Sequence, residues 1–271
     1  MGNKKKIIQN GLVDLFPKNI ETFYDVFCGS CTVTMNADAI YFEVNDLNAA
    51  ITDLIQWFCY FKPEEIIEKL EKQIDKYQLP TFSTDTRKYK GDRGIYKVRY
   101  NKLRDDYNTT RDSELLYLLN IFSNSHMIRF NSNGDFNMPF GNGYLTEDIK
   151  TTLLNHNLDK ITYISNYDFR HYENVDFQKE DFVYLDPPYF TSDATYNENN
   201  GWTEKDENDL HSLCNLLNDR GVKFGISNIV ENTSLMNWAN ENSYKVHIFD
   251  ELHCACGNGN KKRREVYICN Y

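Results

Sequence analysis

The chain has 271 residues, 41% of them hydrophobic and 14% aromatic, which is enough to bury a full core and excludes an intrinsically disordered protein. Its formal net charge is −10, which taken alone argues against a nucleic-acid partner. The apolar runs fall far short of the ~20 residues that span a bilayer, and no apolar segment follows the lysines at the start. We therefore expect a cytoplasmic protein without a signal peptide or a membrane partner.

The first third of the sequence predicts alternating helices and strands. Apolar residues at helical spacing occupy Ile7–Leu15. Thr22–Phe27 predicts a strand, followed by a tight turn and a helix. Ile40–Val44 predicts a second strand and Leu47–Tyr60 another helix, so the chain opens with a βαβ-like unit.

The middle of the sequence has a different pattern. Between Pro63 and Asn124 the apolar residues recur at helical spacing. Ile128–Asn131 and Phe136–Met138 then predict two strands, joined by a turn with Asn-Gly at its tip. We expect several helices followed by a β-hairpin.

Strands and helices alternate again after the hairpin. Phe182–Leu185 is apolar throughout, as in a buried parallel strand. The other predicted elements are a helix at Leu210–Leu217 and strands at Ile161–Ile164, Val222–Ile226, Tyr244–Phe249 and Glu265–Ile268. The pattern indicates one α/β domain formed by residues 1–56 and 157–271, interrupted by a helical and hairpin domain at residues 57–156.

The basic residues gather in two blocks. Arg87–Arg104 contains eight basic residues and one acidic residue, and Lys261–Arg264 adds four basic residues. Phosphates respond to the local field rather than to the summed charge, so both blocks are candidate phosphate contacts despite the acidic total. Solvated helix faces remain the alternative interpretation of either block alone.

Seven cysteines are scattered along the chain, and an odd number in a cytoplasmic sequence argues against a disulfide framework. Cys28 and Cys31 have the C-x-x-C spacing of redox sites, where a helix N-terminus would lower the pKa of a thiol. His253, Cys254 and Cys256 could suggest a metal, but no second ligand pair at zinc spacing accompanies them. We expect buried, inert thiols and no metal.

The strongest motif is Asp186-Pro187-Pro188-Tyr189, which directly follows the apolar strand Phe182–Leu185. Ligands bind beyond the carboxyl ends of strands in open α/β sheets. Two prolines fix the backbone, so the acid and the ring are held in a stiff turn. The Asp186 carboxylate and the Pro187 carbonyl can accept both N–H bonds of an exocyclic amino group, and Tyr189 can stack on the base. A plain turn is the structural alternative.

A second motif, Asp25-Val26-Phe27-Cys28-Gly29-Ser30-Cys31, follows the first predicted strand, and Asp46 follows the second. Gly29 lets the backbone approach a ligand, and an acid at a strand end commonly binds ribose hydroxyls. The full Gly-x-Gly-x-x-Gly phosphate fingerprint is absent. A nucleoside without a pyrophosphate therefore fits this motif better than NAD does.

With these motifs in this order, the chain resembles the Dam-type family of DNA adenine-N6 methyltransferases, and within it the T-even phage enzyme. The resemblance is carried by Gly2-Asn3-Lys4, Asp25–Gly29, Asn45-Asp46, Phe122–Asn124, Met127–Asn131, Pro139-Phe140-Gly141, Asp181–Tyr189, Leu217–Gly225 and Glu265–Ile268. It implies a Rossmann-like α/β sheet of the S-adenosylmethionine-dependent methyltransferases with an inserted target-recognition domain. The implied partner is double-stranded DNA, the implied recognition site is GATC, and we expect a monomer or weak dimer.

The resemblance also implies a role for each matching position. Those expected to contact the cofactor S-adenosyl-L-methionine are Lys4, Asp25, Phe27, Gly29, Asp46, Phe169 and Asp186. Those expected to hold the target adenine for catalysis are Asp186, Pro187 and Tyr189. Those expected to bind DNA, with Arg129 on a guanine, are Phe122, Ser123, Asn124, Met127, Arg129, Asn131 and Pro139.

Two alternatives stay open at this point. The same turn would suit any exocyclic amine, so methylation of cytosine N4 or of RNA is a rival within the enzymes. A DNA-binding protein that has lost catalysis is a rival from another class. Cofactor binding and the identity of the modified base separate the three.

Overall fold

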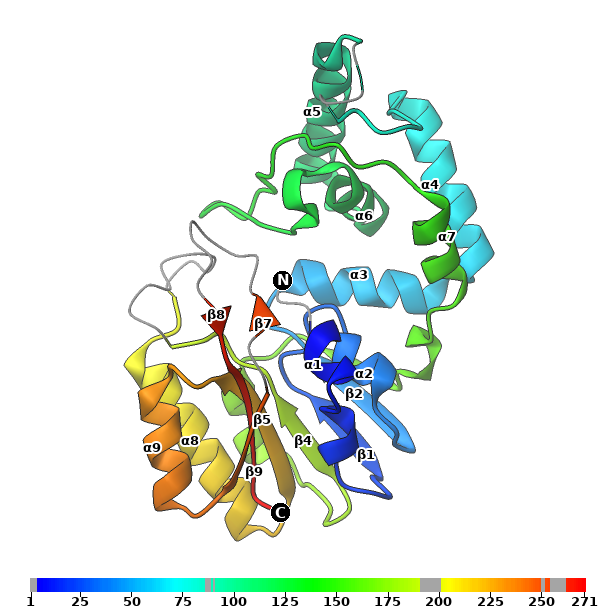
Figure 1. Ribbon diagram of the computed structural model, residues 1–271. Helices are drawn as coiled ribbons and strands as arrows, with labels where there is room; N and C mark the ends of the chain where they lie inside the picture. The colour runs from blue at the N-terminus through cyan, green and yellow to red at the C-terminus, as the bar shows by residue number, and fades with distance from the viewer. Residues whose placement is uncertain (1–3, 86–88, 90, 191–200, 250–251, 254–261) are drawn as a thin grey trace. The chain divides into compact units, whose positions relative to one another are not determined.

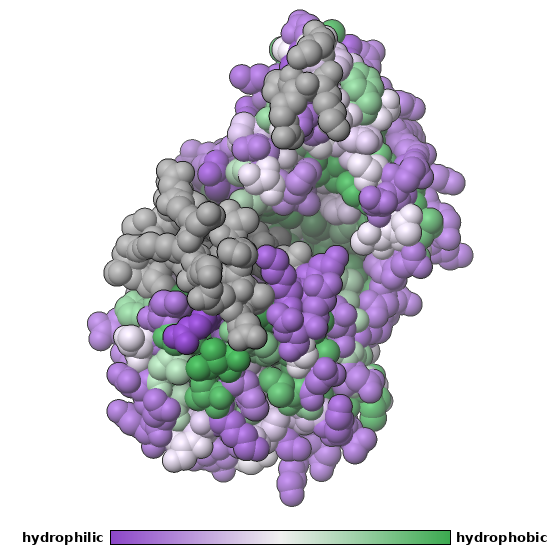
Figure 2. Space-filling model, viewed as in Figure 1, coloured by the Kyte–Doolittle hydropathy of each residue, from purple (hydrophilic) through white to green (hydrophobic). Residues whose placement is uncertain are grey.

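The structure is a computed structural model that describes residues 4–85, 89, 91–190, 201–249, 252–253 and 262–271, with the backbone alone at 252–253 and 262–263. Residue contacts divide the chain into two compact units: Ala50–Asp159, termed the helical unit, and Gly2–Ala49 with Lys160–Tyr271, termed the sheet unit (Figure 1). Figure 2 shows hydrophilic residues over much of the visible surface of each unit, with smaller hydrophobic areas among them. Within the described residues, no helix is long and apolar enough to cross a membrane.

The sheet unit is built on seven strands in the order β3-β2-β1-β4-β5-β9-β6. The first five in this order are parallel, and β9 runs antiparallel to both of its neighbours. The strands are β1 (Thr22–Asp25), β2 (Tyr41–Asn45), β3 (Tyr163–Ser165), β4 (Phe182–Leu185), β5 (Lys223–Ile229), β6 (Lys245–Ile248) and β9 (Glu265–Cys269). A separate antiparallel pair is formed by β7 (Leu252–His253) and β8 (Lys262–Arg263). The expected α/β class and Rossmann-like sheet are confirmed.

Strand β4 shows why this sheet is buried on both faces. Its four residues are fully buried and alternate between two cores. Phe182 and Tyr184 pack with residues of α1, η1 and α2, whereas Val183 and Leu185 pack with residues of α8 and α9. Helices therefore cover both faces, as Figure 1 shows, and the continuous apolar run is the sequence signature of that arrangement. The covering elements are α1 (Lys5–Gln9), η1 (Val13–Leu15), α2 (Thr32–Asn36), η4 (Phe169–Asn174), α8 (Glu204–Asp219) and α9 (Thr233–Glu241).

The helix expected at residues 7–15 is interrupted. Its first part ends at Gln9 and a 3-10 turn begins at Val13. Between them Gly11 has a φ of 91°, in the left-handed region that favours glycine. The interruption leaves Ile7 and Leu12 both buried against the sheet.

The helical unit packs its helices around an aliphatic and aromatic core. Ile66, Leu70, Leu103 and Leu119 are fully buried there, at the helical spacing that the sequence shows. Asp92 caps α5 by accepting a hydrogen bond from the backbone N–H of Gly94 at 2.7 Å. The helices are α3 (Ala49–Tyr60), α4 (Pro63–Tyr77), α5 (Arg93–Thr110), α6 (Ser113–Phe122), η2 (Asn124–His126), α7 (Glu147–Leu154) and η3 (Leu158–Lys160).

The predicted β-hairpin forms its turn but not its strands. The two arms share a single bridge between Phe130 and Phe136. The side chain of Asn108 on α5 accepts from the Phe136 N–H at 2.8 Å and donates to the Phe136 carbonyl at 3.2 Å. One bridge does not make a ladder, so the expectation of two strands was wrong. On the outer side of that bridge, the Asn108 amide satisfies the backbone groups of Phe136 that face away from the other arm.

Candidate active site

Three acidic residues meet where the strand order reverses. β1 pairs with β2 on one side and with β4 on the other. Asp25 ends β1, Asp46 follows β2 and Asp186 follows β4. Because carboxyl ends of parallel strands share one edge of the sheet, these side chains gather at the point where open α/β sheets bind ligands.

Asp46 fixes the turn after β1. Its Oδ2 accepts from the backbone N–H of Gly29 at 3.0 Å, and its Oδ1 accepts from that of Asn48 at 2.9 Å. Gly29 has a φ of 48°, so the turn uses the left-handed region here. Burial raises the pKa of the Asp46 carboxyl, although the two backbone N–H groups oppose that shift. Asp46 therefore holds the loop that carries the expected cofactor residues.

Asn45 joins the ends of three strands, a task that the sequence analysis did not assign. Its Nδ2 donates to the carbonyls of Val26 at 3.0 Å and Tyr167 at 2.9 Å. Its Oδ1 accepts from the Tyr167 N–H at 2.7 Å and from the Ser165 hydroxyl at 2.9 Å. A buried amide at a strand end was the available signal, because such a group must find partners.

Asp25 carries an oxygen for which the described residues offer no partner. Its Oδ2 accepts from the Thr34 hydroxyl at 2.6 Å, whereas its buried Oδ1 accepts no hydrogen bond from them. Burial raises the pKa of this carboxyl to about 7, and the charges of Asp186 and Asp46 add to the shift. A buried acceptor left open at this edge fits a ligand that carries N–H groups or positive charge. The residues present therefore fit S-adenosyl-L-methionine.

The Asp186–Tyr189 turn is held by Lys4 and Glu265. Lys4 Nζ lies 2.8 Å from Asp186 Oδ1 and 3.5 Å from Glu265 Oε2, and it donates a hydrogen bond to the Tyr189 hydroxyl. That hydroxyl donates to Glu265 Oε2 at 3.0 Å. The structure thus brings together Lys4, expected at the cofactor, with Asp186 and Tyr189, expected at the target adenine, and it adds Glu265, which the sequence analysis missed.

The charges in this cluster influence one another strongly. Burial by itself would lower the pKa of Lys4, but the neighbouring Asp186 and Glu265 carboxylates outweigh it, and the pKa is raised. For Asp186, burial raises the pKa although Lys4 opposes the shift. Lys4 therefore remains protonated beside the carboxylate.

Three aromatic rings lie beside the turn after β1. The ring centroids of Phe27 and Phe169 are 5.7 Å apart, and Trp202 lies 5.9 Å from Phe27 and 5.4 Å from Phe169. Phe169 is buried, whereas Phe27 and Trp202 are half-buried. Phe27 and Phe169 were expected at the cofactor, and Trp202 was not.

The expected DNA-binding residues of the helical unit differ in exposure. Phe122 and Ser123 are buried, so their side chains present little surface. Asn124 and Pro139 are exposed, and the Asn124 N–H donates to the Pro139 carbonyl at 2.8 Å. The remaining three are half-buried: Met127, Arg129 and Asn131.

Two of these side chains also shape the hairpin turn. Arg129 Nε donates to Asn137 Oδ1 at 2.8 Å, which orients the guanidinium. Asn131 Oδ1 accepts from the backbone N–H groups of Asn133 and Asp135, both at 2.9 Å, and so closes the turn. Asn131 therefore has a structural task besides the predicted DNA contact.

The basic block on α5 divides into two kinds of side chain. Arg93 donates to the Gly141 carbonyl and to Asn142, and Arg99 donates to the Gln78 carbonyl. Lys97 and Lys102 are exposed. Arg87, Lys88 and Lys90, like the side chains of the block at 261–263, lie outside the described residues.

The described part of the chain supports neither a redox role for the cysteines nor a metal site. The five cysteines whose side chains the structure describes form no disulfide: Cys28, Cys31, Cys59, Cys214 and Cys269. Burial raises the pKa of Cys28, which is opposite to the shift that a reactive thiol needs. No group of three potential metal ligands occurs among the described residues, and Cys254 and Cys256 lie outside them.

Solved structures share only a distant likeness with this chain. A putative methyltransferase, yhhF from Escherichia coli, covers 97% of the chain and is itself covered to 82%, at 12% identity and a TM-score of 0.34. The rRNA methyltransferase aviRa from Streptomyces viridochromogenes covers 98% and is covered to 82%, at 11% identity and a TM-score of 0.33.

Sequence comparisons identify the family. Over its whole length the chain is 30% identical to the modification methylase StsI of Streptococcus sanguinis and 27% identical to the type II methyltransferase M.FokI of Planomicrobium okeanokoites, and it spans 42% of the length of each. It is 25% identical to the type II methyltransferase M1.LlaDCHI of Lactococcus lactis subsp. cremoris, of which it spans 93%. Residues 1–253 match the D12 class of N6 adenine-specific DNA methyltransferases, with Lys4 and the Asp25, Asp46 and Asp186 strand ends inside the matched range. The chain belongs to this D12 class N6 adenine-specific DNA methyltransferase family.

Proposed function

We propose that this chain is a site-specific DNA methyltransferase that transfers a methyl group from S-adenosyl-L-methionine to N6 of an adenine flipped out of the duplex, within the sequence GATC. The observation that carries the proposal is the Asp186–Tyr189 turn, held by Lys4 at the carboxyl end of β4 beside β1. Membership of the D12 class supports the adenine N6 target. The relative StsI, named as a modification methylase, supports a role in marking DNA.

The cofactor side would be formed by the turn after β1. S-adenosyl-L-methionine supplies an electrophilic methyl group on a positively charged sulfur. Asp25 Oδ1, which is buried and has no hydrogen-bond partner among the described residues, would accept hydrogen bonds from the polar groups of the cofactor. Asp46 holds the Gly29 turn, which would lie against the nucleoside of the cofactor, and Phe27 and Phe169 would supply aromatic surface there.

The target side would be formed by the turn after β4. Asp186 and the Pro187 carbonyl would accept the two N–H bonds of the amino group, which would localise the nitrogen lone pair for attack. As the nitrogen–methyl bond forms, the methyl–sulfur bond would break, with S-adenosylhomocysteine as the leaving group and one N6 proton lost to solvent. Tyr189 would stack on the base, and the Tyr189 hydroxyl is held by Lys4 and Glu265. Flipping costs a few kcal/mol and is needed because the amino group is unreachable inside a duplex.

The assignment is tested with Asp186→Ala. We expect methyl transfer to GATC duplexes to be abolished while most of the DNA binding remains, because the turn belongs to the sheet unit and the expected DNA contacts belong to the helical unit. Asp14→Ala, an exposed acid of the same unit, is the matched control. Normal turnover by the Asp186 variant would remove the residue from catalysis.

Sequencing modified bases in DNA from cells that express the chain separates the alternatives. N6-methyladenine in GATC supports the proposal. N6-methyladenine in another sequence refutes only the proposed recognition sequence and leaves the proposed reaction standing. N4-methylcytosine, or methylation of RNA only, favours the enzymatic rivals. No modification together with no cofactor binding favours a DNA-binding protein without catalysis.

A further inference from the structure

Trp202 has no role in the function proposed above, but its ring packs on two residues that do, Phe27 and Phe169. Its ring contacts Phe27, which precedes the Gly29 turn, and Phe169, which begins η4 after β3. The three rings therefore form one aromatic group beside the carboxyl ends of β1 and β3. Phe169 is buried, whereas Phe27 and Trp202 each keep part of their surface exposed.

The indole is held from the interior side. Trp202 Nε1 donates to Glu207 Oε2 at 2.6 Å. Glu207 is only 1% exposed, and its other oxygen accepts from Asn232 Nδ2 at 2.7 Å. The hydrogen-bonding group of the indole is thus satisfied inside the protein, and its remaining chemistry is that of an apolar, polarisable ring.

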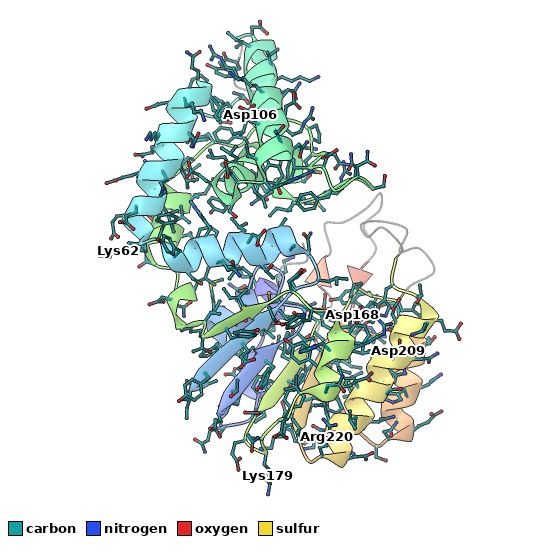
Figure 3. All side chains as sticks on the ribbon, turned by 180° about the vertical axis from the view of Figure 1, so that it is seen from behind. Lys62, Asp106, Asp168, Lys179, Asp209 and Arg220 are labelled. Atoms are coloured by element: carbon teal, nitrogen blue, oxygen red, sulfur yellow. The ribbon has the colours of Figure 1, made fainter. Side chains whose placement is uncertain are left out.

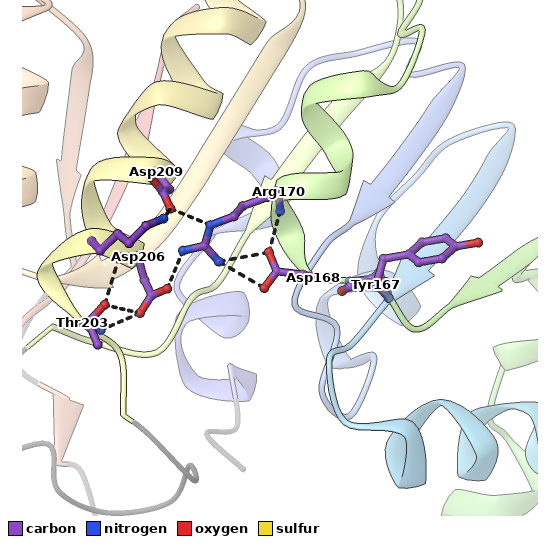
Figure 4. A network of polar contacts seen from close by, with 8 residues as sticks. Tyr167, Asp168, Arg170, Thr203, Asp206 and Asp209 are labelled. Carbon is purple, nitrogen blue, oxygen red and sulfur yellow. Dashed lines mark hydrogen bonds and ion pairs between the residues drawn. The ribbon is translucent and has the colours of Figure 1, made fainter.

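Arg170 fixes the two segments that carry Phe169 and Trp202. It bonds to Asp206 at 2.5 Å and to Asp209 at 2.6 Å, both on α8, and to Asp168 at 3.1 Å in the turn before η4 (Figure 4). Seen from behind, Asp168 and Asp209 lie on neighbouring segments (Figure 3). The guanidinium also lies 4.6 Å from the Phe169 ring centroid. A network of this kind holds the aromatic group in one arrangement.

We infer that Trp202 is a cofactor-binding residue whose ring contacts the adenine of S-adenosyl-L-methionine, with Arg170 and Glu207 as its positioning residues. A planar purine binds a pre-ordered aromatic surface well, because little side-chain freedom is lost on binding. Phe27 connects this surface to the Gly29 turn and to Asp46. The inference rests on the proposed function and names a residue of its cofactor site.

The test is a titration of the protein with S-adenosylhomocysteine, followed by tryptophan fluorescence and by calorimetry. The chain has three tryptophans, Trp57, Trp202 and Trp238. We expect the ligand to change the emission of the wild type and of Trp57→Phe, the matched control in the helical unit. In Trp202→Phe the emission change should disappear while binding persists.

Affinity provides the second measurement. Trp202→Ala should weaken S-adenosylhomocysteine binding about tenfold, within the range of one lost stacking contact, and Trp202→Phe should weaken it less. Thermal unfolding shows whether each variant is folded. An emission change that survives in Trp202→Phe, or unchanged affinity in folded Trp202→Ala, would overturn the inference alone. No ligand binding by the wild type would overturn the proposed function as well.

Discussion

Asp25 carries a buried carboxyl group with one oxygen that lacks a hydrogen-bond partner among the described residues. The residue is 1% exposed, its Oδ2 accepts one hydrogen bond from Thr34, and its Oδ1 has no partner among the described residues. The ionised form is therefore poorly solvated, which raises its pKa from the ordinary 3.8 to about 7. Such an arrangement destabilises the ligand-free fold near neutral pH and is relieved when a cationic or N–H donor binds.

This pKa predicts a pH dependence of folding for the ligand-free protein. Between 3.8 and about 7 the folded state holds a proton on Asp25 that the unfolded state has lost. The free energy of unfolding should therefore fall as pH rises through that window, by up to ~4 kcal/mol. Asp25→Asn should flatten this decline in urea unfolding at pH 5 and pH 8, whereas Asp38→Asn, at an exposed position, should not. An equal decline in the Asp25 variant would contradict the assignment.

The hairpin turn shows how one element depends on another. Its two arms share one bridge, in which the Asn131 N–H donates to the Asp135 carbonyl and the Asn137 N–H donates to the Arg129 carbonyl. The N–H and carbonyl of Phe136 face away from the other arm and bond to Asn108 on α5. Arg111, at the end of α5, holds the tip through the Gly134 carbonyl at 2.7 Å and Asp135 at 2.8 Å. The loop that carries Arg129 and Asn131 is thus positioned by a helix as well as by its own backbone bridge.

Replacing Asn108 should loosen this loop. Asn108→Ala leaves the backbone N–H and carbonyl of the buried Phe136 unpaired, which costs ~1–3 kcal/mol. We expect a loss of unfolding free energy of that size and faster amide hydrogen exchange across residues 128–138. Thr109→Ala, an exposed neighbour on the same helix, is the control. Unchanged exchange in the Asn108 variant would show that the loop is held by other contacts.

At the scale of the whole molecule, a net charge of −10 has to be reconciled with a polyanionic partner. The structure separates the α5 side chains that serve the fold, Arg93 and Arg99, from the exposed Lys97 and Lys102. Among the described side chains of α5, Lys97 and Lys102 are therefore the exposed candidates for phosphate contact. Local positive charge can still direct DNA binding, because the field at the contact surface decides it.

The double variant Lys97→Ala and Lys102→Ala should weaken binding to every DNA sequence alike. Each lost phosphate contact lowers the slope of log affinity against log salt by ~0.9, so the slope should fall by up to ~2. Arg129→Ala should instead lose ~1–3 kcal/mol of discrimination at one guanine. The control for the α5 variant is the double variant Lys72→Ala and Lys76→Ala on α4, which removes the same amount of positive charge from another helix. An unchanged salt slope in the α5 variant would exclude these lysines from the interface.

The sequence by itself determined the elements that carry local signals. An unbroken apolar run followed by two prolines predicted β4 and its turn, because burial on both faces leaves no room for polar residues and proline cannot continue a strand. The acid after each early strand predicted the edge where ligands bind. Strand bounds were close where hydrophobic patterning was strong, as at Thr22–Asp25.

Only the tertiary structure decided which distant side chains meet. Lys4 and Tyr189 are separated by 185 positions and Tyr189 and Glu265 by 76, so no local pattern reports their contact. The insertion of β9 between β5 and β6, and the packing of Trp202 on Phe27 and Phe169, likewise follow from the folded arrangement. Periodicity records which face of an element is buried, whereas partners across the sheet are chosen by shape and charge once the elements pack.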